Sequence, residues 1–199
     1  MKNLFLSPLI FLSLVANCQI IEWDNFSEEK MSEVMFVEMN AYVKWIHNGD
    51  SLILSKVIQE QIIPRNYALI KKNKSGPLEK SHNMEWFTPG RGNDLPDTLR
   101  SKIIKENANP LQLKSKLMEK FNCYGLFCYS EILESITYRG FESGQTYQSV
   151  AIKFIRGWRD SPAHRGWMEA NYHNKVIVGV TTFYDTQTRT IFISFVHVS

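Results

Sequence analysis

Two histidines and one glutamate stand at positions from which their side chains could meet in one site. The histidines are expected beside turns, and the glutamate is expected on a strand. His82 follows a basic loop with one Gly and one Pro, Glu134 lies in a run with strand character, and His164 follows Ser161-Pro162. Two imidazoles and one carboxylate suit a divalent metal such as zinc, with an open fourth position. The same groups also suit a hydrogen-bond network that shapes a cleft without metal. Both interpretations stay open on the residues alone.

Several common catalytic motifs are absent from the sequence. It contains no Gly-rich phosphate loop, no His-Glu-x-x-His, no nucleophile elbow and no carboxylate-rich calcium loop. These absences argue against nucleotide-dependent enzymes, zincins and the common serine hydrolases. If the chain is an enzyme, Glu134 is the candidate base, acting on a metal-bound water. The other histidines, His47, His173 and His197, are expected to have structural roles.

The composition is that of an ordinary globular protein. The 199 residues are 44% hydrophobic and 13% aromatic, with a net charge of +3, which fits one domain with a proper core. No block of five or six like charges occurs, so a nucleic-acid partner has little support.

The N-terminus has the form of a secretory signal peptide. A basic start at Lys2 precedes the apolar run 4–15, which is too short to span a bilayer. Small residues before Gln19 place the cleavage site there, so we expect residues 1–18 to be the signal and residues 19–199 one domain. The mature protein would be secreted or periplasmic, without a transmembrane span. A lipid anchor on Cys18 is the alternative.

Signal removal leaves two cysteines, Cys123 and Cys128. In an oxidising compartment a pair this close is expected to form a disulfide. A disulfide that closes so short a loop is expected to stabilise the fold by only about 2 kcal/mol. The spacing does not match a two-residue redox or zinc motif, so the predicted bond is a structural one.

The hydrophobic pattern predicts helices first and a hairpin last. A helix is expected over 27–46, a second over 51–72 that Pro64 should kink or split, and a third after Ser143 whose end Gly157 loosens. A short strand or turn is expected over 131–138. Two β-branched and aromatic runs, 176–184 and 190–196, flank a polar turn and predict an antiparallel hairpin. This order indicates an α+β domain.

One phrase carries a family resemblance. The segment from Trp158 to Met168 contains Trp-x-x-Ser-Pro-x-His-Arg and precedes a hairpin with Gly179. It resembles the bacterial branch of the CAP superfamily, also called SCP-like. The resemblance covers about residues 27–199, although only residues 158–180 match a specific motif of the family. It implies a three-layer α-β-α sandwich with a small antiparallel sheet, in which His82, Glu134 and His164 converge on a central cleft that can bind a divalent metal.

The sequence departs from the family pattern at three places. Ser161 stands where members with a full tetrad have a second Glu, residues 83–128 look like an insertion, and the basic residue of the first helix is displaced to Lys44. Because the second Glu is missing, we expect an extracytoplasmic binding module for a lipid, peptide or cell-envelope ligand. The alternative is a metal-assisted, peptidase-like hydrolase that uses the same cleft.

Overall fold

The computed structural model describes residues 19–47, 51–88, 92–93, 95–107, 129–138, 143–169 and 176–198. The predicted signal peptide and the predicted Cys123–Cys128 disulfide lie outside these residues.

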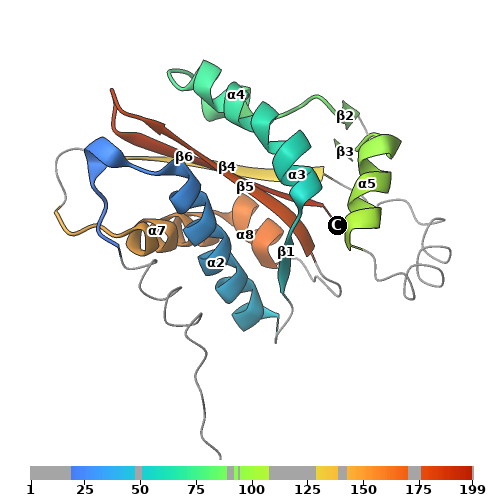
Figure 1. The fold of residues 1–199 in the computed structure, drawn as a ribbon, viewed down its shortest axis with the longest axis horizontal. Helices are drawn as coiled ribbons and strands as arrows, with labels where there is room; N and C mark the ends of the chain where they lie inside the picture. The colour runs from blue at the N-terminus through green and yellow to red at the C-terminus, as the bar shows by residue number, and fades with distance from the viewer. Residues whose placement is uncertain are drawn as a thin grey trace, which may run out of the picture.

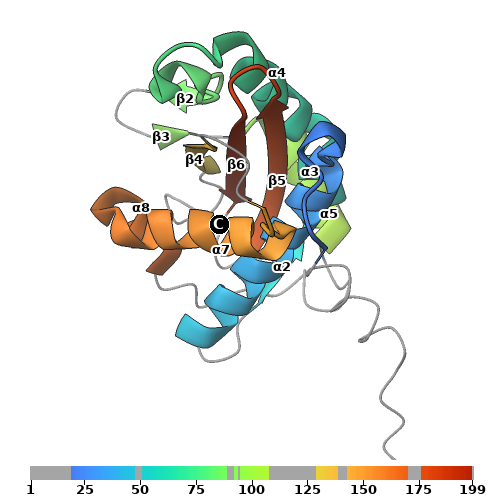
Figure 2. The same cartoon turned by 90° about the vertical axis from the view of Figure 1, so that its left-hand side faces the viewer.

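A four-stranded sheet forms the middle layer, and helices cover both of its faces (Figure 1). The strand order is β1 (Leu52–Leu54), β5 (Val176–Asp185), β6 (Thr190–Val198) and β4 (Tyr129–Thr137). One face carries α2 (Glu28–Ile46), α7 (Tyr147–Asp160) and α8 (Pro162–Glu169). The other carries α3 (Lys56–Gln61) and α4 (Ile63–Asn73). The turned view in Figure 2 separates the two helical layers, as the predicted α+β sandwich requires.

Four smaller elements complete the described chain. They are η1 (Trp23–Asn25), η2 (Leu78–Ser81), the β2–β3 ribbon (Phe87–Thr88 with Gly92–Asn93) and α5 (Asp97–Asn107). The last of these belongs to the segment expected to be an insertion. Its Leu99 and Ile103 pack with Ile58 and Ile62, and its Glu106 carboxylate accepts the Ser55 hydroxyl at 2.5 Å. This part of the segment is therefore built into the α3 side of the fold.

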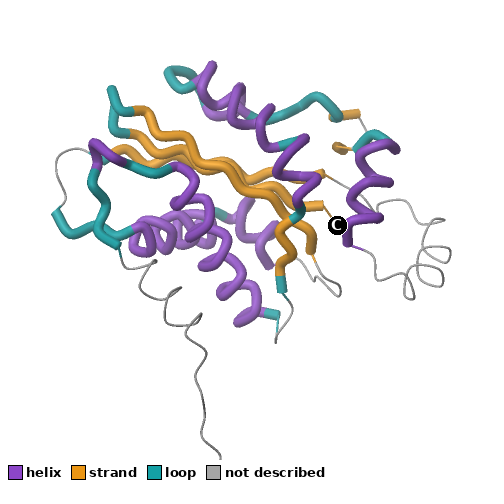
Figure 3. The backbone as a smooth tube through the Cα atoms, viewed as in Figure 1, coloured by secondary structure: helices purple, strands orange, loops and turns teal. Residues whose placement is uncertain are grey.

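The predicted C-terminal hairpin is confirmed and forms the centre of the sheet. β5 pairs antiparallel with β6 from Ile177↔Val198 to Asp185↔Thr190. The strand predicted over 131–138 is β4, which pairs antiparallel with the other side of β6. Asp185 organises the hairpin turn, because its carboxylate accepts the Thr188 hydroxyl at 2.7 Å and the Lys74 ammonium at 2.8 Å. Figure 3 shows these strands running side by side between the helices.

The helix predicted over 51–72 is wrong at its start. Leu52–Leu54 form β1, which runs parallel to β5, so the sheet is mixed rather than wholly antiparallel. Strand pairing decides the conformation here, because Leu52–Leu54 are in register with Val176–Val178 and Ser55 N donates to Val178 O at 2.9 Å. The Leu52 N–H is bonded outside the sheet, to Asn40 Oδ1 of α2 at 2.9 Å. The predicted break near Pro64 is confirmed, because α3 ends at Gln61 and Pro64 lies in the first turn of α4.

The largest part of the core lies between the sheet and the α2–α7 pair. Met31, Met35 and Met39 of α2 are fully buried with Phe154 and Trp158 of α7. Both helices begin at side-chain caps, since Ser27 accepts Lys30 N and Thr146 accepts Ser149 N. α7 continues through Gly157 to Asp160, so this glycine does not loosen the helix end as expected.

Candidate functional site

The candidate site lies at β4, one of the two edge strands of the sheet. Glu131 and Glu134 are three residues apart on this strand, so their side chains point to opposite faces. Glu131 shares its face with Leu133, which packs against Ile70 of α4. Glu134 shares its face with Ile132, which packs in the core beside α7.

The carboxylate of Glu131 is saturated with hydrogen bonds. Its side chain is only 3% exposed. It accepts from Asn66 Nδ2 at 3.1 Å, from Asn83 N at 3.0 Å and from the Ser194 hydroxyl, and it lies 3.1 Å from His82 Nδ1. Glu131 thereby ties the η2 loop and α4 to the sheet. Sequence reasoning missed it; the available signal was a carboxylate on a strand face shared with the buried Leu133.

This contact orients the imidazole of His82. A carboxylate only accepts hydrogen bonds, so Nδ1 of His82 donates the N–H. In the neutral ring the lone pair then lies on Nε2. The side chain is 29% exposed and borders a hollow of about 640 Å³ beside Arg65, Asn83 and Met84. His82 can therefore offer Nε2 to a ligand while Glu131 holds the ring.

Glu134 contrasts with Glu131 in having an unsatisfied oxygen. Its Oε2 is buried and has no hydrogen-bond partner among the described residues. Burial raises the pKa of the Glu134 carboxyl above its usual range. The carboxylate lies against the backbone of Gly157, where an added Cβ would be 2.7 Å from Oε1 and 3.0 Å from Oε2. A glycine at position 157 is what leaves room for this carboxylate.

His164 is half-buried and lies in α8, not in the turn that Pro162 was expected to fix. Proline suits the first turn of a helix, and Arg165 N donates to Ser161 O at 2.8 Å as this helix begins. Burial lowers the pKa of His164, and the charge of His82 lowers it further. His82 is thus near enough to His164 to influence the protonation of His164.

The donor set does not form a metal centre in the part of the chain that is described. No three His, Cys, Asp or Glu side chains there are grouped so that they could hold an ion. Nδ1 of His82 faces Glu131, and Glu134 lies on the opposite face of β4. Convergence of His82, Glu134 and His164 on one ligand stays a prediction.

A second candidate site is the groove between α2 and α7, which we call the α2–α7 groove. It has a volume of about 260 Å³. Trp45 is 76% exposed at this groove. Its lining combines apolar and cationic side chains: Ala41, Tyr42, Trp45, Ile152, Ile155, Arg156 and Arg159, with Glu38.

Comparisons with known proteins find similarity in structure only. No family model matches the sequence, and a search of curated proteins finds no relative. A solved outer surface protein from Borrelia burgdorferi is 14% identical, with a TM-score of 0.44, and the match covers 90% of this chain and 96% of that one. The CAP domain of Enterococcal PrgA is 12% identical, with a TM-score of 0.41, over 95% of this chain and 70% of that one.

Within the described ranges, no helix combines the length and the apolar character needed to cross a bilayer.

Proposed function

We propose that this domain is an extracytoplasmic binding module whose site is the exposed side of β4 around His82, Glu134 and His164. The observation that carries the proposal is the buried Oε2 of Glu134, which has no partner among the described residues. A buried acceptor without a donor costs about 1–3 kcal/mol, and more when it is charged. An O–H or N–H of a ligand would remove that cost, and Nε2 of His82 would add a second polar contact.

The ligand class follows from these groups. The site offers a carboxylate acceptor and imidazole nitrogens. The hollow beside His82 holds about 640 Å³, within the usual range for ligand pockets, and the residues that line it do not include Glu134 or His164. These properties suit a ligand rich in hydroxyl and amide donors, such as a fragment of the cell envelope. Export of the chain is part of the proposal and rests on the basic start and apolar run before Gln19.

The alternative is a metal-assisted, peptidase-like hydrolase with Glu134 as the base. It requires His82, His164 and Glu134 to share one ion. The described geometry gives it less support, because no three His, Cys, Asp or Glu side chains of the described residues are grouped so that they could hold an ion, and because Glu134 packs against Gly157.

A disaccharide-tetrapeptide muropeptide tests both hypotheses, because it carries hydroxyl, amide and peptide groups. We expect it to shift the imidazole NMR signals of His82 and His164 and to remain uncleaved by mass spectrometry. Glu134→Leu should weaken binding about tenfold or more, the size of a charged hydrogen bond. Glu60→Leu is the matched control, since Glu60 is exposed on α3.

The possible outcomes separate the two hypotheses. Cleavage that requires added zinc and stops with EDTA would establish the hydrolase. Absence of any imidazole shift at millimolar muropeptide would overturn the binding site at β4.

A second ligand class is favoured by the exposed Trp45. An acyl chain could cover Trp45, Tyr42 and Ile152, while Arg156 and Arg159 face an anionic head group. Laurate should shift Trp45 fluorescence to the blue, and methyl laurate, which lacks the charge, should bind more weakly. The shift should disappear in Trp45→Phe. An unchanged affinity in the Arg156→Gln, Arg159→Gln double variant would remove the carboxylate contact.

A further inference from the structure

The sheet has a second edge that β1 covers only in part. β1 pairs with Val176–Val178, whereas β5 continues to Asp185. The last contact of this ladder is Ser55 N donating to Val178 O at 2.9 Å. Main-chain groups alternate sides along a strand, so those of Val180, Thr182 and Tyr184 face the same edge beyond β1.

Side chains take the place of a neighbouring strand at two of these three residues. The Gln59 amide accepts from Val180 N at 2.9 Å and donates to Val180 O at 3.2 Å. The Glu28 carboxylate accepts from Tyr184 N at 2.8 Å. Thr182 lies between them, and only its hydroxyl is contacted from this side, by Ser32 at 2.9 Å. Within the described chain, its main-chain N–H and C=O have no partner here.

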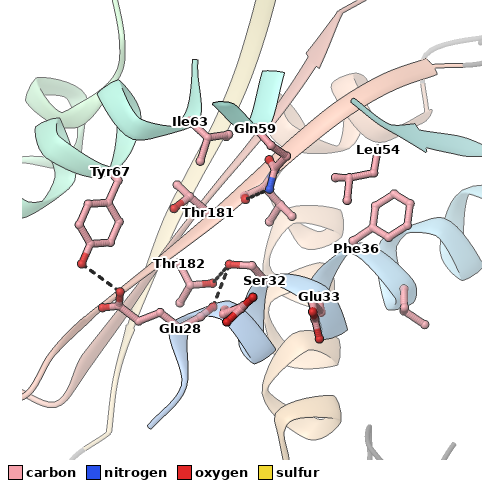
Figure 4. Close-up of a pocket in the computed structure, with 13 residues that line it drawn as sticks. Glu28, Ser32, Glu33, Phe36, Leu54, Gln59, Ile63, Tyr67, Thr181 and Thr182 are labelled. Atoms are coloured by element: carbon pink, nitrogen blue, oxygen red, sulfur yellow. Dashed lines mark hydrogen bonds between the residues drawn. The ribbon is translucent and has the colours of Figure 1, made fainter. Parts of the chain in front are cut away.

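This edge forms the floor of a groove of about 660 Å³ between α2 and the α3–α4 layer (Figure 4). Phe36 and Leu54 lie toward one end of the groove, and Glu28 and Tyr67 lie toward the other. The Tyr67 hydroxyl donates to Glu28 at 2.9 Å, which joins α4 to α2 across that end.

The lining of the groove is acidic and apolar at once. Glu28, Glu29 and Glu33 line it, and none of its lining residues is Lys or Arg. Val37 and Leu54 are each 43% exposed, and together with Phe36 they give the groove an apolar part. The charge therefore favours a cationic occupant, and the exposed side chains favour one that also carries apolar residues.

We propose that this groove binds an extended, cationic segment of a partner protein, which adds to β5 as a short strand. The main chain of the segment would pair with Thr182, its Lys or Arg side chains would face Glu29 and Glu33, and its apolar side chains would cover Val37 and Leu54. Gln59 and Glu28 already bond the main chains of Val180 and Tyr184, so main-chain pairing is confined to Thr182 between them. The floor from Val180 to Tyr184 spans about 13 Å, a length that an extended segment of about five residues would cover. Main-chain hydrogen bonds supply affinity in this mode, and side-chain pockets supply specificity. The groove lies at the opposite edge of the sheet from β4, so the proposal is independent of the muropeptide site.

The test uses a fluorescent hexapeptide with the alternating sequence Val-Lys-Val-Lys-Val-Lys and reads its anisotropy. Removing two ion pairs with Glu29→Gln and Glu33→Gln should weaken binding about fivefold. The Glu60→Gln, Glu79→Gln pair removes the same charge from exposed positions outside the groove and should leave affinity within about twofold. Melting curves of both variants check that the fold is intact.

Two further measurements separate strand addition from simple charge attraction. A hexapeptide with N-methyl groups on alternate residues keeps its charge and loses main-chain donors, so its binding should be abolished. The amide proton of Thr182 should move downfield when the unmodified peptide binds. No binding at millimolar peptide, equal losses in the two double variants, or full binding of the N-methylated peptide would overturn the proposal.

Discussion

Glu131 and Glu134 lie on one strand, and their surroundings are opposite in character. On the α4 side, Glu131 is buried and meets four donors from Asn66, His82, Asn83 and Ser194. On the α7 side, Glu134 has an oxygen with no donor among the described residues. The first arrangement fixes a loop and leaves no freedom to bind. The second leaves the Glu134 oxygen able to accept a hydrogen bond from a ligand, at a cost in stability. One face of β4 therefore stabilises the fold, and the other is the candidate for binding.

The largest expected effect is loss of the Glu131 carboxylate. Glu131→Leu should lower the free energy of unfolding by about 3 kcal/mol, because several buried donors would lose their acceptor. Urea unfolding measures this value, and the same substitution at Glu134 should change stability far less. A loss below about 1 kcal/mol at Glu131 would break the comparison.

His197 lies on the face of the sheet that is turned toward α7. Its titration should make the largest contribution to the loss of stability at acid pH. Burial lowers its pKa from 6.5 to about 4. The unfolded chain therefore binds a proton that the fold excludes, and stability falls as the pH drops from about 6.5 to 4. The full contribution is about 3 kcal/mol. Urea unfolding between pH 7 and pH 4 should show this fall in the parent protein and a shallower one in His197→Leu.

Substitutions at two glycines are expected to have effects of intermediate size on stability, and the two can be compared directly. An added Cβ at Gly179 would lie 2.3 Å from Ile58 Cγ2 in packed core, so Gly179→Ala should cost about 1–3 kcal/mol. At Gly157 the obstacle is the movable carboxylate of Glu134, and alanine favours the helix by about 1 kcal/mol. Gly157→Ala should therefore leave the melting temperature nearly unchanged while weakening muropeptide binding. A large loss of stability at Gly157 would show that Glu134 cannot move.

The smallest expected effect is that of Glu134→Gln on stability. Burial raises the pKa of Glu134, so folding favours its neutral form. Its contribution is present at low pH and is lost as the pH rises through the folded-state pKa. Glu134→Gln should raise the melting temperature slightly at pH 7 and have no effect at pH 3. A destabilised variant at pH 7 would indicate that the carboxylate has a donor in the folded protein.

The elements that could be predicted are those whose pattern is local. The helix over 27–46, the break near Pro64 and the C-terminal hairpin all follow from residues that are close together in the sequence. β1 could not be predicted, because Leu52–Leu54 become a strand only by pairing with Val176–Val178 at the far end of the chain. The hydrophobic residues before α3 fit a helix until that partner is known.

The same distinction applies to the candidate site. His82, Glu134 and His164 could be named from the sequence because of the motif around Trp158 and the order of elements around it. Glu131 could not, since its role depends on Asn66 and Asn83, which only the folded chain brings to it. Strand alternation separates Glu131 from Glu134 but does not say which of them is saturated.

The position of the hairpin in the chain has a consequence for how the protein assembles. β5 and β6 occupy the centre of the sheet, and among the described residues β1 pairs with β5 and β4 pairs with β6. A ribosome makes these central strands after it has made α2, α3, α4 and α7, so the apolar faces of those helices emerge before the strands that will cover them. The sheet therefore cannot begin to form until β5 has been made, and its long-range contacts favour slow folding. The order of elements thus leaves the helices of both layers without their packing partner for most of the time that the described chain is being made.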